Sequence, residues 1–152
     1  MRNVLLTGVG GQGTVLAAKV LAQAAQAKGW QVRTAETIGM AQRGGSVVSH
    51  VRMGDNGEEV IAPLVAKGTA DMIIAFEPAE AARVLPYLAP DGVMVSATTS
   101  IQPITAALST EPYLAEATIA SLRGRLNGCA AAPARFVLVD DEAVLSQVEN
   151  RK

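Results

Sequence analysis

The sequence predicts an α/β fold with helices on both faces of a β-sheet, and three observations lead to that prediction. Short apolar runs of strand type alternate with Ala- and Leu-rich segments of helical spacing. A glycine-rich turn joins the first apolar run to the first helical segment. A later segment alternates side chains with the period of a strand and ends in a second turn. We therefore expect a three-layer α/β/α sandwich with a Rossmann-like, mainly parallel sheet that one hairpin makes mixed.

The expected elements follow one another closely, and at 152 residues the chain has the length of one ordinary domain, so we expect residues 1–152 to form a single domain. The runs of strand type cover residues 4–7, 31–35, 46–53, 71–76, 93–96 and 136–139. The segments of helical type cover residues 14–28, 78–88 and 113–126, with a last one that Asp140 or Asp141 caps and that runs through Val148.

Glycine and proline residues set the expected boundaries. Gly29 suits the position just after a helix, and Pro78 suits the first turn of the next one. The tripeptide at 90–92, Pro-Asp-Gly, is typical of a turn before the strand at 93–96. The tetrapeptide at 54–57, Gly-Asp-Asn-Gly, is typical of a hairpin turn that would fold residues 46–53 back on residues 59–61.

Composition excludes several kinds of function. Thirteen basic residues nearly balance fourteen acidic ones, so the net charge of -1 provides no field that would hold a nucleic acid. Cys129 is the only cysteine, which excludes an internal disulfide and an iron–sulfur cluster held by this chain alone. No apolar stretch approaches the roughly 20 residues that span a bilayer, and the apolar start ends too early for a signal peptide. A cytoplasmic protein without membrane contact is expected.

The glycine-rich turn is the first candidate site. Its residues are Gly8, Gly10, Gly11, Gln12 and Gly13. Backbone N–H groups at such a turn, together with the start of a helix, favour an anion, and Glu36 follows where a Rossmann domain has the carboxylate that binds a ribose. The turn can equally be a tight connection whose glycines only allow close packing, and the amide of Gln12 takes up room that a pyrophosphate would need. Both interpretations stay open.

The chain offers few groups for chemistry of its own. His50 is the sole histidine, and a lone histidine on a strand is more often a hydrogen-bonded structural residue than a catalyst. Cys129 has no base that can be named as its partner, so we interpret it as an incidental thiol. We expect no catalytic residue and no metal site in this chain alone.

The loop at 36–45 is the second candidate site, because loops with several glycines often carry function. Arg43 can present its planar guanidinium to a carboxylate or a phosphate, although an arginine on a surface loop is by itself unremarkable. The residues that we single out as facing a partner or an active site are Met40, Gln42, Arg43, Gly44 and Gly45.

The two segments together carry a family resemblance. Val9-Gly10-Gly11-Gln12-Gly13, then Glu36-Thr37, then the run from Gly39 to Arg52 (Gly-Met-Ala-Gln-Arg-Gly-Gly-Ser-Val-Val-Ser-His-Val-Arg) resemble the γ-type subunits of 2-oxoacid:ferredoxin oxidoreductases. The Met-Ala-Gln-Arg-Gly-Gly version is most similar to the β subunits of indolepyruvate ferredoxin oxidoreductases. The resemblance covers at least residues 3–139, with both motifs in the same order.

The resemblance implies a role in anaerobic metabolism, in a complex that oxidatively decarboxylates a 2-oxoacid with coenzyme A and reduces ferredoxin. A large α subunit would carry thiamine diphosphate, Mg²⁺ and the [4Fe-4S] clusters and pass electrons to ferredoxin. This chain would complete that active site, with its glycine turn placed to hold coenzyme A phosphates. It would be inactive alone and would bind no cofactor by itself, with a homodimer as its form in isolation.

Two other roles stay open beside this one, namely a stand-alone nucleotide- or coenzyme A-binding module and a structural subunit whose turn binds nothing. Family members usually continue for another strand and helix, so we expect a chain that ends at Lys152 to be a truncated or divergent version. The family tends to have an asparagine after its fourth strand, where this chain reads Ser96-Ala97-Thr98-Thr99.

Overall fold

The computed structural model describes residues 1–39, 44–101, 113–127 and 136–148. Met40, Gln42, Arg43 and Cys129 therefore lie outside the described residues. In chain order the elements are β1 (Arg2–Val9), α1 (Thr14–Ala27), β2 (Gln31–Ile38), β3 (Ser46–Gly54), β4 (Ala70–Ala75), α2 (Pro78–Val84), the 3-10 turn η1 (Leu85–Tyr87), β5 (Leu88–Ala97), α4 (Ala115–Asn127), β6 (Phe136–Val139) and α5 (Asp141–Ser146).

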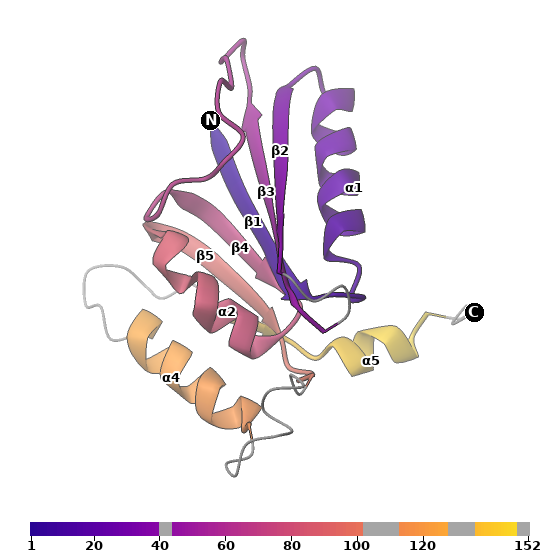
Figure 1. The fold of residues 1–152 in the computed structure, drawn as a ribbon, viewed down its shortest axis with the longest axis vertical. Helices are drawn as coiled ribbons and strands as arrows, with labels where there is room; N and C mark the ends of the chain where they lie inside the picture. Colours follow the sequence, from indigo (N-terminus) through magenta and orange to yellow (C-terminus); the bar gives the residue numbers. More distant parts are fainter. Residues whose placement is uncertain (40–43, 102–112, 128–135, 149–152) are drawn as a thin grey trace.

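The described strands form one six-stranded sheet in the order β2-β3-β1-β4-β5-β6. The pairs β1/β4, β4/β5 and β5/β6 are parallel, whereas β3 runs antiparallel to both of its neighbours. Helix α1 lies on one face of the sheet, and α2 and α4 lie on the other (Figure 1). The expected three-layer architecture with a mainly parallel, mixed sheet is confirmed.

Alternating side chains of each strand feed two hydrophobic cores. On β1, Leu5 packs with residues of α2 and α4, whereas Val4 and Leu6 pack under α1. Helix α1 turns a row of small residues to the sheet, and these buried residues are Ala18, Ala22 and Ala25. Their spacing of four and three residues places them on one helix face, and their small size lets the helix approach the strands closely.

The chain leaves the middle of the sheet in two directions. From β1 it passes through α1 on one face to β2, and from β4 it passes through α2 on the other face to β5. The carboxyl ends of β1 and β4 therefore flank a topological switch point, the place where open α/β sheets form their ligand crevices. In Figure 1 the arrowheads of these strands meet at the lower edge of the sheet.

The expected hairpin between residues 46–53 and 59–61 is wrong. Residues 55–58 do form a turn, in which the N–H of Glu58 donates to the carbonyl of Asp55 at 2.9 Å, but the segment after it is not a strand. Both edges of β3 are already occupied, because β1 pairs along one side and β2 along the other, so no edge is free for a returning strand. Side chains of β2 hold Val60 instead, since Gln31 Oε1 accepts from its N–H at 3.2 Å and Arg33 Nε donates to its carbonyl at 3.3 Å.

The expected turn at residues 90–92 lies inside a strand. Strand β5 already begins at Leu88, after a helix that ends at Val84 and a single 3-10 turn, so the helix expected over 78–88 is also shorter. The Pro-Asp-Gly segment forms a bulge, because pairing with β4 steps from Leu88 to Val93 while β4 advances from Ala70 to Met72. A turn signal in the sequence here marks an irregular strand.

Other boundary predictions are confirmed. Gly29 has φ +80° just after α1, and its N–H donates to the carbonyl of Gln26 at 2.8 Å. Asp140 caps α5, since its Oδ1 accepts from the N–H of Ala143 at 3.0 Å. Among the described residues no helix is long and apolar enough to cross a membrane.

Candidate functional site

The two candidate segments meet at the carboxyl edge of the sheet. Strand β3 runs antiparallel, so its first residue, Ser46, lies opposite Val9 at the end of β1. The N–H of Gly10 donates to the carbonyl of Gly45 at 2.9 Å, and the N–H of Gly39 donates to the carbonyl of Ser46 at 2.8 Å. We call Gly39, Gly45 and Ser46 the loop base, because they flank the loop that follows β2. Backbone hydrogen bonds thus join the glycine turn to the loop base at the switch point.

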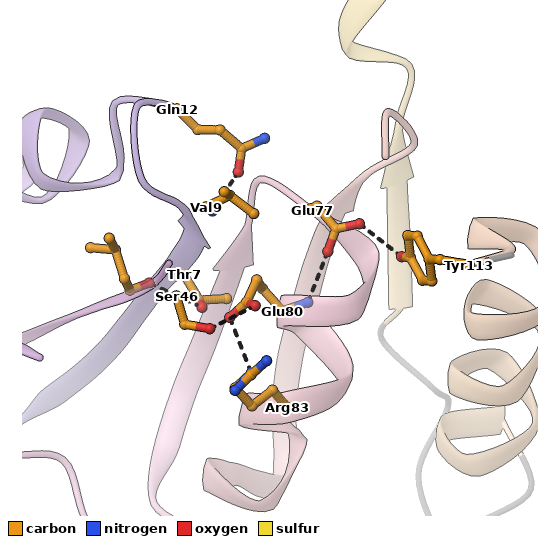
Figure 2. Close-up of polar contacts among 9 residues, drawn as sticks. Thr7, Val9, Gln12, Ser46, Glu77, Glu80, Arg83 and Tyr113 are labelled. Carbon is orange, nitrogen blue, oxygen red and sulfur yellow. Dashed lines mark hydrogen bonds and ion pairs between the residues drawn. The ribbon is translucent and has the colours of Figure 1, made fainter. Parts of the chain in front are cut away.

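Gln12 bridges the ends of the two central strands. Its Oε1 accepts from the N–H of Val9 at 2.7 Å, and its Nε2 donates to the carbonyl of Phe76 at 2.9 Å. Figure 2 shows the side chain of Gln12 over the end of β1. The amide satisfies a donor at the end of β1 and an acceptor just after β4. It therefore lies where the turn of a dinucleotide-binding domain would approach a pyrophosphate.

The glycines of the turn serve two purposes. A Cβ on Gly8 would lie 2.7 Å from Thr14 Oγ1 and 2.8 Å from Gln12 Oε1, so Gly8 makes room for those two side chains. Gly11 and Gly13 have φ of +101° and +84°, and a Cβ on either would meet no atom of the described residues within 4 Å. Both are required by backbone conformation. The inner side of the turn is thus filled by the protein's own groups, while its outer side is open.

A shallow pocket lies on that outer side. Its volume is about 420 Å³, and its lining residues are Val9, Gly10, Gly11, Gly13, Thr14, Val15, Leu16, Lys19 and Val47. Helix α1 begins here without a side-chain cap, because its N-cap residue is Gly13. Uncapped N–H groups at a helix start favour an anion, and Lys19 provides the one charged group of this lining.

Glu36 does not lie where a ribose-binding carboxylate would. It is exposed on β2 opposite Ser49 of β3, which in turn lies opposite Leu6 of β1. Because β3 separates β2 from β1, Glu36 is two strand spacings, or roughly 10 Å, away from β1. It is level with Leu6, three residues before the end of β1 at Val9. The geometry gives no support to the ribose-binding interpretation.

Two buried glutamates, Glu77 and Glu80, lie on the other side of the switch point and are not among the site residues that the sequence predicts. Glu77 is 1% exposed and caps α2, with its Oε2 accepting from the N–H of Glu80 at 3.0 Å. Its Oε1 accepts from the hydroxyl of Tyr113 at 2.7 Å. Burial, together with the hydrogen bond to Glu77 and the charge of that carboxylate, raises the pKa of Tyr113, so the tyrosine remains a donor.

Glu80 connects helix α2 to the base of the loop. It is 5% exposed, and its Oε1 accepts from the hydroxyl of Ser46 at 2.8 Å (Figure 2). Its Oε2 has no hydrogen bond to any residue that the structure describes, but it lies 3.4 Å from Nε of Arg83, whose side chain is mostly exposed. The signal in the sequence is Glu77-Pro78-Ala79-Glu80 after an apolar strand, which fits an N-cap, a first-turn proline and a glutamate at the third helical position.

His50 is a structural residue, as expected. Its Nδ1 accepts from the N–H of Val65 at 3.2 Å, and its ring meets Tyr87 edge-on at 6.1 Å. Burial lowers the pKa of His50, which favours the neutral ring.

A second pocket, of about 430 Å³, lies at the ends of β5 and β6 and is lined by Thr98, Thr99, Ser100, Asp140 and Glu142. Asp141 Oδ1 accepts from the N–H of Thr99 at 3.1 Å. Although burial works the other way, such hydrogen bonds leave the pKa of Asp141 lowered. Among the residues that the structure covers, no three His, Cys, Asp or Glu side chains are grouped to hold a metal ion.

Several known proteins share this sequence pattern. The subunit IorB of indolepyruvate oxidoreductase from Archaeoglobus fulgidus is 47% identical over 111 residues, which are 73% of this chain and 53% of that protein. The IorB subunit of Pyrococcus horikoshii is 43% identical over 116 residues, or 75% of this chain and 56% of its own length. The chain thus spans about half the length of the curated relatives it matches.

Solved structures share the fold. The γ subunit of a keto/oxoacid ferredoxin oxidoreductase from Geobacter sulfurreducens aligns with 97% of this chain and 87% of its own, with a TM-score of 0.51 and 23% identity. The 2-oxoglutarate:ferredoxin oxidoreductase of Magnetococcus marinus, with 2-oxoglutarate, coenzyme A and succinyl-CoA bound, aligns with 62% of this chain and 16% of its own, with a TM-score of 0.53 and 21% identity.

A family model completes the comparison. The model described as pyruvate ferredoxin/flavodoxin oxidoreductase matches residues 3–151, nearly the whole chain. Together with the glycine turn and the loop base that meet at the switch point, this match shows that the chain belongs to the pyruvate ferredoxin/flavodoxin oxidoreductase family.

Proposed function

We propose that this chain is the small subunit of a 2-oxoacid:ferredoxin oxidoreductase that acts on indolepyruvate or a related aryl pyruvate. The complex would use coenzyme A to decarboxylate the 2-oxoacid, giving an acyl-CoA, carbon dioxide and reduced ferredoxin. Support comes from the identity of 47% and 43% to two IorB subunits. The observation that carries the proposal is the hydrogen bond from Gly10 to Gly45, because it joins the two family segments into one surface.

The loop between β2 and β3 is the proposed contact with a large α subunit. Its proposed partner-facing residues are Met40, Gln42, Arg43, Gly44 and Gly45, of which the structure describes the last two. Gly44 has φ +78° at the point where the loop returns to the sheet. Arg43 would offer a guanidinium to a carboxylate or a phosphate of the shared active site.

The glycine turn is the proposed contact with coenzyme A. Gln12 fills the inner side of the turn, so a phosphate would approach the outer side, where Gly11, Gly13 and Lys19 line the open pocket. These residues fit an anion, because the start of α1 has no side-chain cap and a lysine is near. Bound there, coenzyme A would supply the thiol that accepts the acyl group.

The remaining cofactors belong to the proposed partner. Thiamine diphosphate, Mg²⁺ and the [4Fe-4S] clusters would be held by the large subunit, which would also pass electrons to ferredoxin. We further propose that residues 1–152 form one γ-type domain, that the complex works in the cytoplasm and that the isolated chain forms a homodimer.

A stand-alone nucleotide- or coenzyme A-binding module is the second candidate, and the open pocket at the start of α1 favours it. The bridging amide of Gln12 and the distant Glu36 count against a dinucleotide. Calorimetry of the isolated chain with NAD, FAD, ATP and coenzyme A separates the roles. Heat with any of these ligands supports the stand-alone module, because the proposed subunit is expected to bind no cofactor by itself. No heat with any of them leaves the subunit role and the structural role.

Co-purification tests the main proposal. The affinity-tagged chain, expressed at native level in the cells that encode it, is expected to retain a larger polypeptide containing thiamine diphosphate and iron–sulfur clusters. The purified complex should reduce a viologen dye with indolepyruvate and coenzyme A, and omission of either substrate serves as the control. A chain that is recovered alone from a fresh extract would contradict the proposal.

A further inference from the structure

We propose that Glu80 is a positioning residue, which holds the start of β3 through Ser46 and so fixes the base of the loop that the proposed function places against the partner. The inference rests on that proposed function and deepens it. Glu80 lies on α2, in the helix layer, whereas Ser46 opens an internal strand of the sheet. The hydrogen bond between Ser46 Oγ and Glu80 Oε1, at 2.8 Å, joins residues 34 positions apart in the chain.

The position of Glu80 in its helix makes this contact notable. A glutamate at the third helical position usually turns back to the N–H of the N-cap residue and closes a capping box. Glu77 occupies the N-cap, and its own carboxylate already accepts from the N–H of Glu80. The carboxylate of Glu80 instead turns to the sheet and accepts from Ser46. The carboxylate of Glu80 therefore joins the helix layer to the sheet and does not cap its own helix.

The start of β3 is held from three directions. The carbonyl of Ser46 accepts from Gly39 at the end of β2, and the carbonyl of Gly45 accepts from Gly10 in the glycine turn. Both of these are backbone contacts within the edge of the sheet. In the described part of the chain, the hydroxyl of Ser46 adds the only hydrogen bond from this segment to α2. The hydrogen bond between Ser46 and Glu80 is thus the contact that fixes the position of the loop base relative to the helix layer.

The burial of Glu80 indicates that its hydrogen bond with Ser46 does more than fill space between the layers. A carboxylate at 5% exposure is costly when one of its oxygens has no hydrogen bond within the described part of the chain, and the guanidinium of Arg83 at 3.4 Å offsets that cost only in part because it is solvated. A hydrogen bond to a charged acceptor is stronger and more directional than one between neutral groups. Such a bond suits a segment that must present neighbouring residues in one fixed arrangement.

The experiment combines three variants in the intact complex, purified from cells whose own copy of the gene carries each change. Glu80→Ala and Ser46→Ala each delete this hydrogen bond, whereas Glu80→Gln keeps an oxygen of similar reach that can accept from Ser46. Ser96→Ala is the matched control, because it removes the hydrogen bond of another buried serine of the sheet, from Ser96 Oγ to the carbonyl of Ala97 at 3.0 Å, on β5 and away from β3. Hydrogen exchange of the Gly10 and Gly39 amides reports on the loop base, and kcat and KM report on function.

We expect Glu80→Ala and Ser46→Ala to raise exchange at both glycine amides about tenfold. In the complex each should lower kcat between about 10-fold and 100-fold with KM for the 2-oxoacid changed less than about twofold. The double variant should be no worse than either single one, since both remove the same contact. Glu80→Gln should restore most of the activity, and Ser96→Ala should change neither kcat nor exchange at the two glycines.

Two results would overturn the inference while leaving the proposed function intact. One is a wild-type complex that turns over and a Glu80→Ala complex with unchanged kcat. The other is a Ser46→Ala complex with unchanged kcat beside a slow Glu80→Ala complex, which would show that Glu80 does not act through its hydrogen bond with Ser46. If the wild-type chain yields no complex that oxidises any 2-oxoacid, the proposed function itself fails, and the positioning role falls with it.

Discussion

Replacement of Gln12 by alanine is the sharpest test of how the switch point is built. The substitution removes both hydrogen bonds of the bridge and leaves the N–H of Val9, a residue that is 5% exposed, without its acceptor. An orphaned buried donor costs about 1–3 kcal/mol, and the lost bond to the carbonyl of Phe76 adds about 0.5–1.5 kcal/mol. We therefore expect Gln12→Ala to lower the free energy of unfolding by about 1.5–4.5 kcal/mol, with a fall in Tm of about 3–18 °C.

Denaturant unfolding, followed by far-ultraviolet circular dichroism and by the fluorescence of Trp30, measures this loss. Coincident transitions of the two signals justify a two-state treatment. Gln23→Ala is the matched control, because Gln23 is exposed on α1 and its replacement should change stability by less than about 0.5 kcal/mol. Gln12→Glu should also destabilise, since a carboxylate can accept from Val9 but cannot donate to Phe76. A Gln12→Ala chain as stable as Gln23→Ala would refute the bridge as a stabilising contact.

Three further predictions concern the bulge, the histidine and the loop. Gly92→Ala should cost about 1–3 kcal/mol in thermal unfolding, because its Cβ would lie 2.6 Å from the carbonyl oxygen of Ala70, whereas Gly124→Ala, with open space on α4, should stabilise by about 0.5–1 kcal/mol; equal effects would contradict the bulge. Since the pKa of His50 is lowered in the folded chain, unfolding takes up a proton below about pH 6.5, and stability should fall as pH drops through that value; His50→Gln should flatten the curve there, and an unchanged slope would exclude this histidine as its source. Arg43→Ala should leave Tm unchanged and lower turnover of the complex by about 10-fold or more, whereas Arg123→Ala, at an exposed position of α4, should change neither Tm nor turnover; full turnover with Arg43→Ala would make Arg43 a surface charge.

Local periodicity predicts most of the elements of this fold, because burial on one face of a strand or helix leaves its mark within a few residues. The apolar run at 4–7 lies within β1, and the run at 71–76 and the helical segment at 14–28 each extend one residue past β4 and α1, which are of the expected type. What local pattern does not contain is the choice of strand partner. The turn at 54–57 has the residues of a hairpin, yet the strand before it pairs with β1 and β2, which lie far from it in sequence.

The candidate site, like the fold, has some residues that the local sequence predicts and others that it does not. The glycine turn is visible in the sequence because positive φ and close contacts leave glycine as the only suitable residue. Glu77 and Glu80 leave a weaker signal, since glutamates at the start of a helix are ordinary on solvent-facing helices as well. Their role depends on Ser46 and Tyr113, which are contacts between elements that no local spacing encodes.

The bridge of Gln12 explains why a turn with the glycine spacing of a nucleotide site differs from one. In a dinucleotide-binding domain the neighbour of β1 is β2, so the carboxylate at the end of β2 and the turn after β1 address the same ligand. Here β3 lies between those strands and brings the loop base, not a carboxylate, beside the turn. The polar groups at the ends of β1 and β4 are then satisfied by an amide of the turn itself. Gln12 thus fills the inner side of the switch point, and the open pocket lies on its outer side. Such a surface suits contact with a partner or with the end of a long ligand, and it does not suit a cofactor enclosed in one chain.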